Sequence, residues 1–272
     1  MSGSPFHRTE AICLRVIDYS ETSQILRFYA RDSGKISCIA KGAKRKKSTF
    51  RGAFHFLAVY NLVRMEKMSG SLDLVTQAEL IEDFHALAED FSRYSTACYI
   101  AEFLDTFTLD GQVVGNLYDI TSEALHRLQK DVPLPDLLFS FESKALRALG
   151  FFPRLRECGG CRSAITTSEA YFAPRDGGVI CLRCRPRDQK RFLVRRAALE
   201  SLVHFGEGDM PREPIKKWLV DALRTILDTV ITYQLERTLR SSRFVRRALL
   251  ESDKLMDNNS VTRVAPSLQK GV

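Results

Sequence analysis

Four of the seven cysteines stand in two C-x2-C pairs whose spacing is typical of a tetrahedral metal site. Cys158 and Cys161 form the first pair, and Cys181 and Cys184 form the second after nineteen intervening residues. Each pair can turn two thiolate sulfurs toward one cation, so the two pairs together supply four ligands. Because four thiolates leave no position for water or substrate, the sequence predicts a structural site that holds one zinc ion. Thiolates also bind iron, and the spacing alone leaves that alternative open.

The other three cysteines, Cys13, Cys38 and Cys98, lie among apolar neighbours and are expected to be small buried hydrophobic residues. The first residues, MSGSPFHRTEA, lack the apolar stretch of a secretory signal, which favours a cytoplasmic protein without a disulfide framework. The sequence also contains no run of 18 apolar residues, so no membrane span is expected.

Positive charge is concentrated in the two outer thirds of the chain. The net charge of +8 divides into +4 for residues 1–83 (13 basic, 9 acidic), −5 for 84–150 (5 and 10) and +9 for 151–272 (23 and 14). Residues 33–65 contain eight Lys or Arg and no acid, and the segment KGAKRKKSTFRG (41–52) contains six of the eight. Such an excess predicts contact with a nucleic acid or another polyanion. A second basic cluster, RCRPRDQKRFLVRR (183–196), fits either an extension of that contact or a solvated face.

The basic segment lies within a region that the sequence predicts to be a small β-barrel. Five runs rich in β-branched and aromatic residues are separated by turn-forming residues: TEAICLRVIDY, SQILRFYAR, GKISCIAKG, FHFLAVYNLVRM and SLDLVTQAEL. Five short strands match the count of an OB-fold, and an SH3-like barrel has the same count. The basic segment would then connect the third and fourth strands.

From residue 84 the apolar residues recur with helical spacing. Helices are predicted over 84–110, 117–128 and 137–150, where Gly150 fits a left-handed cap. Residues 151–191 resemble loops and carry the cysteine pairs, with Gly177 and Gly178 suited to a hairpin turn before the second pair. Helical spacing returns in 194–205, 215–236 and 240–251, and the polar tail from residue 252 is expected to be disordered. The sequence therefore predicts the α+β class.

No constellation of catalytic residues is found. The sequence lacks a phosphate-binding G-x4-G-K-[ST] loop, an H-E-x-x-H motif and a G-x-S-x-G elbow. Its five histidines, at positions 7, 55, 85, 126 and 204, share no motif. The sequence thus favours a binding protein over an enzyme.

Several segments occur in the same order as in the bacterial DNA repair and recombination mediator family RecO. DYSETSQI, RDSGKISCIAKGAKRKKSTFRG and QAEL are similar to its N-terminal domain, and FESKALRALGFFPRL followed by CGGC and GGVICLRC is similar to its zinc-bearing members. The resemblance covers about residues 9–250. It implies an OB-fold in 1–83, a helical domain in 84–157 and 192–251, a four-cysteine zinc-ribbon insertion in 158–191, and a tail in 252–272.

The resemblance also implies a function without catalytic turnover. Family members bind single- and double-stranded DNA, anneal complementary strands, and act with RecR and the acidic C-terminal tail of the single-stranded DNA-binding protein SSB to help load the RecA recombinase. They are cytoplasmic and associate with the nucleoid during repair. The basic face of the family's OB-fold maps onto Lys41, Lys44, Arg45, Lys46, Lys47 and Arg51. Lys35, in the same acid-free region, is the seventh residue of the predicted DNA-binding set. No motif marks the contacts for RecR or SSB.

These residues suggest how DNA is held. The basic side chains neutralise phosphates, and if about five are neutralised the slope of log affinity against log salt is roughly −3.5 on single strands. Phe50, Phe54, Phe56 and Tyr60 are candidates for stacking on bases, although burial in the barrel is the more common role of such residues. The alternative function is a zinc-ribbon adaptor whose basic surface docks acidic protein tails, with DNA binding secondary.

Overall fold

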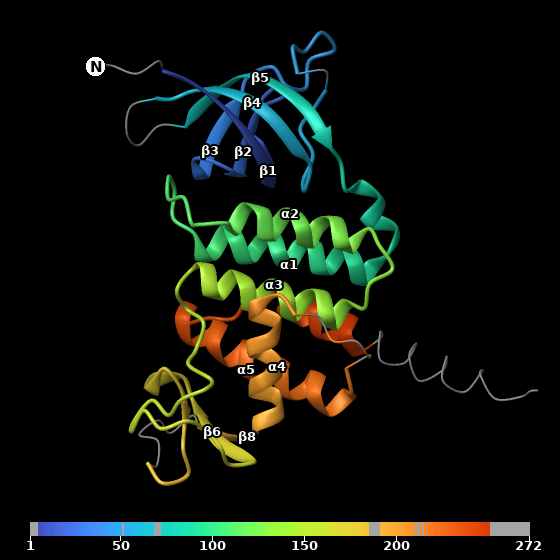
Figure 1. Ribbon diagram of the computed structural model, residues 1–272. Helices are drawn as coiled ribbons and strands as arrows, with labels where there is room; N and C mark the ends of the chain where they lie inside the picture. Colours follow the sequence, from blue (N-terminus) through green and yellow to red (C-terminus); the bar gives the residue numbers. More distant parts are fainter. Residues whose placement is uncertain are drawn as a thin grey trace, which may run out of the picture.

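The chain folds into a β-barrel, a stack of helices and a small three-stranded sheet, arranged one after another along the molecule (Figure 1). The computed structural model describes residues 5–50, 52–67, 72–184, 191–209, 211, 213 and 215–250. The tail predicted from residue 252 lies outside the described residues. The α+β class is confirmed.

Five strands form the barrel: β1 (Phe6–Asp18), β2 (Gln24–Ala30), β3 (Gly34–Ala40), β4 (Val59–Met65) and β5 (Asp73–Glu82). Their order is β1-β2-β3-β5-β4, and β1 closes the barrel because it pairs antiparallel with both β2 and β4. The contact between β3 and β5 is parallel and short, at Cys38–Asp73 and Ile39–Leu74. The five predicted strands and the OB-like barrel are therefore confirmed.

The fourth strand starts later than the sequence predicts. The predicted run began at Phe54, but residues 54–58 are irregular because Leu57 has a left-handed backbone (φ 66°) that an extended strand does not allow. Hydrogen bonds from the Leu57 amide to the Cys13 carbonyl (2.8 Å) and from the Cys13 amide to the Ala58 carbonyl (2.9 Å) hold this segment on β1. These bonds continue the pairing of β1 with β4 beyond its last paired residues, Ile12 and Val59.

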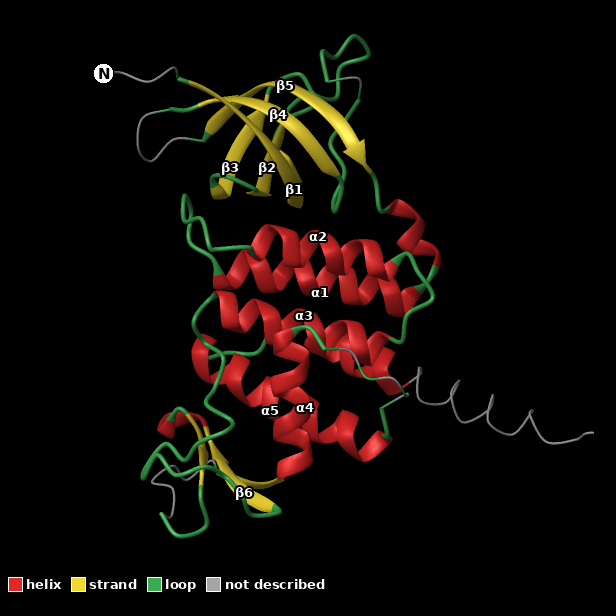
Figure 2. Ribbon diagram, viewed as in Figure 1, coloured by secondary structure: helices red, strands yellow, loops and turns green. Residues whose placement is uncertain are grey.

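Below the barrel, the helices pack in layers (Figure 2). They are η1 (His85–Glu89, a 3-10 turn), α1 (Phe91–Phe107), α2 (Leu117–Leu128), α3 (Leu134–Ala148), α4 (Arg196–Glu207) and α5 (Lys217–Leu235), with a further helix over 242–250. Asp90 divides the first predicted helix, because its carboxylate accepts hydrogen bonds from the amides of Ser92 and Arg93 and so begins α1. The second helix has its predicted bounds. The third begins three residues early, after Pro133, and Gly150 follows it with φ 78° as predicted.

The barrel is fixed to the helices by ion pairs and by close backbone packing. The Arg27 guanidinium lies 2.9 Å from the Asp105 carboxylate of α1. A Cβ on Gly34 would lie 2.0 Å from the Gln112 carbonyl oxygen, so the β2–β3 turn admits only glycine against this loop. The apolar core continues across the contact, since Ile12, Leu14 and Tyr29 of the barrel join the helical core.

A buried ionic cluster joins three of the helices. The Glu142 carboxylate of α3 accepts two hydrogen bonds from the Arg224 guanidinium of α5, at 2.8 and 2.9 Å. Tyr99 of α1 donates to the same carboxylate, and Arg224 also pairs with Asp228 at 2.9 Å. Glu142 is fully buried, so these partners offset the cost of removing its charge from water.

The cysteine region contains more regular structure than the loops that the sequence predicts. Strands β6 (Glu169–Ala173), β7 (Gly178–Ile180) and β8 (Phe192–Arg195) form a sheet in the order β7-β6-β8. A 3-10 turn, η2 (Pro174–Asp176), and Gly177 connect β6 to β7, which confirms the predicted hairpin turn. Helix α4 begins at Arg196, not at Val194 as predicted, because Val194 pairs with Ala170 in the sheet. The domain limits at 83, 157, 191 and 251 stay predictions.

Candidate metal centre and nucleic-acid interface

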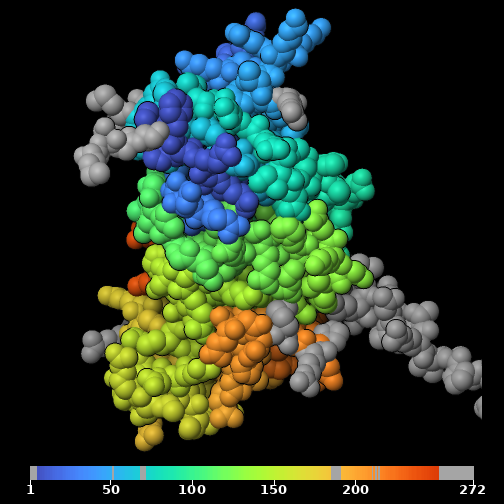
Figure 3. Space-filling view, turned by 45° about the horizontal axis from the view of Figure 1, so that its top comes forward, coloured from blue at the N-terminus to red at the C-terminus, as the bar shows by residue number. Residues whose placement is uncertain are grey.

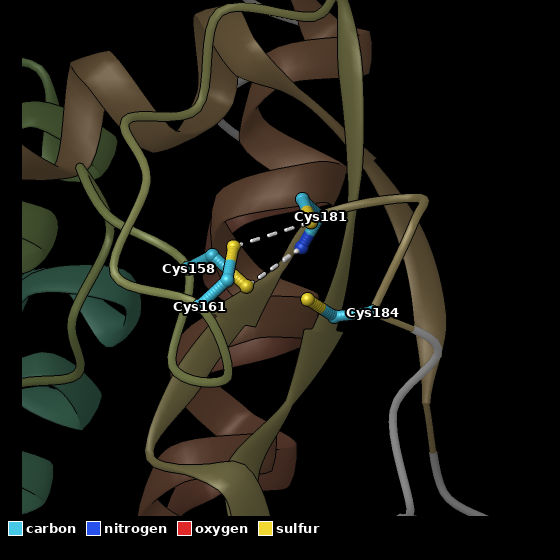
Figure 4. Close-up of side chains that lie close together, drawn as sticks. All are labelled: Cys158, Cys161, Cys181 and Cys184. Atoms are coloured by element: carbon cyan, nitrogen blue, oxygen red, sulfur yellow. Dashed lines mark hydrogen bonds between the residues drawn. The ribbon is translucent and has the colours of Figure 1, made fainter.

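The four paired cysteines converge at one end of the small sheet (Figure 4). Their sulfur atoms all lie within 4.8 Å of one another, and the Sγ atoms of Cys161 and Cys181 are 3.8 Å apart. Zinc–sulfur bonds of about 2.3 Å in a tetrahedron place the sulfurs about 3.8 Å apart, so the spacing fits one such ion. These four residues can bind one metal ion, as the sequence predicts.

The backbone around the cysteines is folded into two tight turns. In the first, the Cys158 amide donates to the Ser163 carbonyl (2.9 Å) and the Arg162 amide donates to the Cys158 carbonyl (2.9 Å). The second follows β7 directly, with the Cys184 amide 3.1 Å from the Cys181 carbonyl. The segment that precedes the first turn passes close to β7 at Gly178, where a Cβ would lie 2.1 Å from the Arg154 carbonyl oxygen. This close contact between the two segments brings the two turns together.

Hydrogen bonds favour the thiolate form of two of the four cysteines, Cys158 and Cys161. Burial raises the pKa of Cys158, but amide donors, among them Cys161 and Cys181, outweigh it, and the net shift of this pKa is downward. The hydroxyl and amide of Ser163 lower the pKa of Cys161. The neighbouring cysteine sulfurs, first that of Cys181, raise the pKa of Cys184. A divalent cation bound among the four sulfurs would favour the thiolate form of all of them, because its positive charge offsets the repulsion between neighbouring thiolates.

Residues 41–50 of the basic segment form an ordered loop that projects from the barrel on the side away from the helices (Figures 1 and 3). Ala43 is fully buried in the barrel core, and the Lys44 amide donates to the Thr22 carbonyl (3.0 Å). Hydrogen-bonded turns shape the rest of the loop; in one of them the Arg45 amide donates to the Gly42 carbonyl (3.1 Å). Five basic side chains of the loop are exposed: Lys41, Lys44, Arg45, Lys46 and Lys47.

Lys44 differs from the other four because it is engaged within the protein. Its ammonium lies 2.7 Å from the Asp18 carboxylate at the end of β1. The hydrogen bond from Lys44, followed by that from Gln24, lowers the pKa of Asp18, so this carboxylate stays charged at neutral pH. Lys41, Arg45, Lys46 and Lys47 form no ion pair with an acidic residue in the described part of the chain, and they are the free cations of the loop.

Two residues of the predicted DNA-binding set are not part of this exposed group. Lys35 is only 8 % exposed, and its ammonium donates to the Asp105 carbonyl oxygen at 2.7 Å. We therefore correct the prediction for Lys35: it fixes the barrel to α1, because its charge is already compensated by Asp105 and Asp110. Arg51 lies outside the described residues.

The aromatic residues near the loop serve mainly the barrel core. Phe54 and Tyr60 are buried, with their ring centroids 4.9 Å apart. Phe50 is half-buried and packs on Phe54 at 5.4 Å, and Phe56 is half-buried against the helical core. Burial, the more common role of such residues, therefore accounts for Phe54 and Tyr60.

The second basic cluster, 183–196, lies at the other end of the molecule, with the helical layers between it and the loop (Figure 1). Residues 185–190 lie outside the described residues. Of the others, Arg195 lies over the Trp218 ring at 5.2 Å, and Arg196 pairs with Glu200 at 3.3 Å. These two arginines therefore have partners within the fold.

Sequence reasoning missed a third group of exposed basic residues beside the barrel. Arg237, Arg240 and Arg243 follow α5 and line a groove with residues of α1 and β1. Their three-residue spacing in RTLRSSRFVRR was the available signal. The spacing could not show that this segment folds back against α1, because it is held by hydrogen bonds to Glu102 of that helix, more than 130 positions earlier.

Comparisons with known proteins agree with the arrangement. The sequence model described as "Recombination protein O N terminal" matches residues 1–84, and "Recombination protein O C terminal" matches residues 88–243. The chain is 33% identical over 252 residues to the DNA repair protein RecO of Desulforudis audaxviator, covering 90% of this chain and 98% of that protein. It is 30% identical over 246 residues to the DNA repair protein RecO of Symbiobacterium thermophilum, covering 88% and 96%. None of the helices among the described residues has the length and apolar character needed to cross a membrane.

Proposed function

Because the chain belongs to the RecO recombination protein family of DNA repair, we propose that it is a DNA-binding recombination mediator. In this proposal it binds single- and double-stranded DNA, anneals complementary strands, and works with RecR and SSB to help load RecA. It acts in the bacterial cytoplasm, at the nucleoid during repair. Binding rather than catalysis is its role.

The observation that carries the proposal is the exposed basic loop at 41–50. Its four free cations, Lys41, Arg45, Lys46 and Lys47, stand on a backbone that the barrel already holds in place. An ordered loop loses less conformational entropy on binding than a flexible one, so more of the energy of counterion release appears as affinity. Contacts to phosphates carry no sequence information, which suits a mediator that acts anywhere in a genome.

In the proposed annealing step, the loop lowers the repulsion between two strands. Cations held close together on one surface neutralise phosphates of both strands, so complementary bases can meet. The cysteine site would have a structural part in this protein: Cys158, Cys161, Cys181 and Cys184 would hold zinc, which supplies cross-links for a region with a small core of its own.

Binding of DNA to a double charge-reversal variant tests the proposal. Lys46→Glu with Lys47→Glu should weaken binding of single strands and duplexes of any sequence. Lys130→Glu with Lys216→Glu changes the net charge by the same amount at exposed positions on the helical domain and should leave binding unchanged. Equal losses in the two variants would show that net charge, rather than the loop, determines affinity. Unchanged affinity in the first would remove the loop from the DNA site.

An acidic peptide, added as a competitor, separates this proposal from the adaptor alternative. If the loop chiefly docked acidic protein tails, the Lys46/Lys47 variant would lose binding of the peptide and retain binding of DNA.

A further inference from the structure

A groove of about 620 Å³ lies between the barrel and the helical domain. One wall comes from β1 and from Phe56, the floor from α1, and the other wall from residues 237–244. The α1 residues that line it, among them Phe91, Tyr94 and Cys98, recur at spacings of three and four, so they form one face of the helix. The volume falls in the range of sites that bind a small ligand or part of a larger one.

Three aromatic side chains that line the groove are partly exposed. Phe91 is 48%, Tyr94 37% and Phe244 39% exposed. Phe91 and Phe244 meet edge to face, with ring centroids 6.3 Å apart, across the two walls. The Arg247 guanidinium lies over the Phe91 ring at 5.4 Å, so another flat group could contact only the part of each ring that remains exposed.

Four arginines surround these rings: Arg15, Arg237, Arg240 and Arg243. All four are exposed, and none forms an ion pair with an acidic residue in the described part of the chain. Arg243 lies over the Phe244 ring at 4.6 Å. Guanidinium groups bind phosphates in a bidentate manner and stack on planar rings, so their presence beside aromatic residues favours a ligand with both phosphates and bases.

The two acidic residues of the groove are already compensated. Glu102 accepts hydrogen bonds from the amides of Arg240 and Ser241, both at 2.8 Å, and so holds the start of the 242–250 helix in place. Asp105 pairs with Arg27 and Lys35. The groove therefore presents positive charge to a ligand, and Glu102 holds the backbone of its arginine wall at Arg240 and Ser241.

The groove lies near the basic loop along β1. Arg15 is three residues from Asp18, the partner of Lys44, which is about 10 Å along an extended strand. A nucleic-acid strand that contacts the loop can therefore reach the groove within a few nucleotides.

We propose that this groove is a subsite for unstacked bases of single-stranded DNA, through which the protein distinguishes single strands from duplex. The arginines contact phosphates, and one or two bases stack on the rings of Phe91, Tyr94 and Phe244. Bases in a duplex are already stacked and cannot enter, whereas the loop binds the backbone of either form. The inference rests on the proposed DNA-binding function and adds a site outside the loop.

The test compares two aromatic substitutions in the groove with one outside it. Tyr94→Leu with Phe244→Leu should lower affinity for a labelled oligothymidylate about tenfold and leave affinity for a hairpin duplex unchanged. Trp218→Leu removes a ring of similar exposure (40%) that does not line the groove and should change neither affinity. Thermal unfolding of each variant confirms that it is folded.

The outcomes separate this inference from the proposed function. If the groove variant binds oligothymidylate as the wild type does, or loses duplex affinity equally, the subsite does not exist. If it loses binding of an acidic peptide and keeps that of DNA, the groove is a protein-binding site. Absence of DNA binding by the wild type would instead refute the proposed function itself.

Photocrosslinking keeps the inference testable even if the variant fails to fold. Wild-type protein irradiated with an oligonucleotide that carries 5-iodouracil should form adducts at Phe91, Tyr94 or Phe244. Adducts confined to the 41–50 loop would overturn the proposal.

Discussion

Removing two charges from the loop should change the salt dependence of DNA binding by a calculable amount. Lys46 and Lys47 are exposed, and neither forms an ion pair within the described part of the chain. Each phosphate contact contributes about −0.7 to the slope of log affinity against log salt on single strands. The double substitution Lys46→Gln and Lys47→Gln should therefore flatten the slope by about 1.4.

The difference in slope has a direct consequence for measured affinities. Over a fourfold rise in salt, the ratio of wild-type to variant affinity should shrink about sevenfold, since four raised to the power 1.4 is about seven. This ratio does not depend on contacts that both proteins share, such as those of the proposed groove. Fluorescence anisotropy of a labelled oligothymidylate, titrated at several salt concentrations, measures it.

The matched control is the double variant Lys130→Gln and Lys216→Gln, whose slope should equal that of the wild type. If the ratio of wild-type to Lys46/Lys47 variant affinity stays constant with salt, these lysines do not neutralise phosphates and the reasoning fails. If the control variant had a slope as flat as that of the Lys46/Lys47 variant, the slope would depend on the net charge of the protein and not on contacts made by these two lysines.

Three further predictions concern the rest of the fold. The double variant Cys158→Ser and Cys181→Ser should lose binding of zinc and become sensitive to proteolysis in the cysteine region, whereas Cys98→Ser should show neither effect. If atomic absorption found the same metal content in the double variant as in the wild type, the assignment of the four cysteines as ligands would be contradicted. Glu142→Ala should lower the free energy of unfolding by about 3–5 kcal/mol, because it leaves the Arg224 charge buried without its carboxylate partner. A loss below about 1 kcal/mol, measured by urea denaturation, would show that the residues of the cluster do not depend on one another. Burial raises the pKa of Asp136 from 3.8 to about 6, so the folded state holds this proton more tightly than the unfolded state, and the stability contributed by the protonated acid is lost as pH rises through that interval. Asp136→Asn should therefore raise the melting temperature at pH 7 and have little effect on it below pH 3.8. A change in melting temperature that does not depend on pH would refute the raised pKa.

The sequence indicates the barrel and the cysteine cluster well because their signals are local. The strands alternate with turn residues, and the C-x2-C spacing places two sulfurs in one turn whatever surrounds it. The start of β4 is different: residues 54–58 are as apolar as the strand, and only the left-handed conformation of Leu57 against β1 interrupts it. Apolar pattern alone does not record such a tertiary contact.

Charged residues show the same limit. Lys35 and Lys46 both lie in a region free of acids, yet Lys35 is buried because Asp105, 70 positions later, is placed beside it by the docking of α1. The pair formed by Glu142 and Arg224 and the groove beside Glu102 also depend on helices that meet only in the folded protein. Local charge predicts where a polyanion is attracted, but long-range packing decides which of the charges remain available.

Annealing of complementary DNA strands that are both coated with SSB tests the central claim most directly. The purified protein should accelerate the appearance of duplex. The Lys46→Glu/Lys47→Glu variant should lose most of that acceleration, and the Lys130→Glu/Lys216→Glu variant should retain it. Wild-type protein that leaves the rate unchanged, or a loop variant as active as the wild type, would contradict the account.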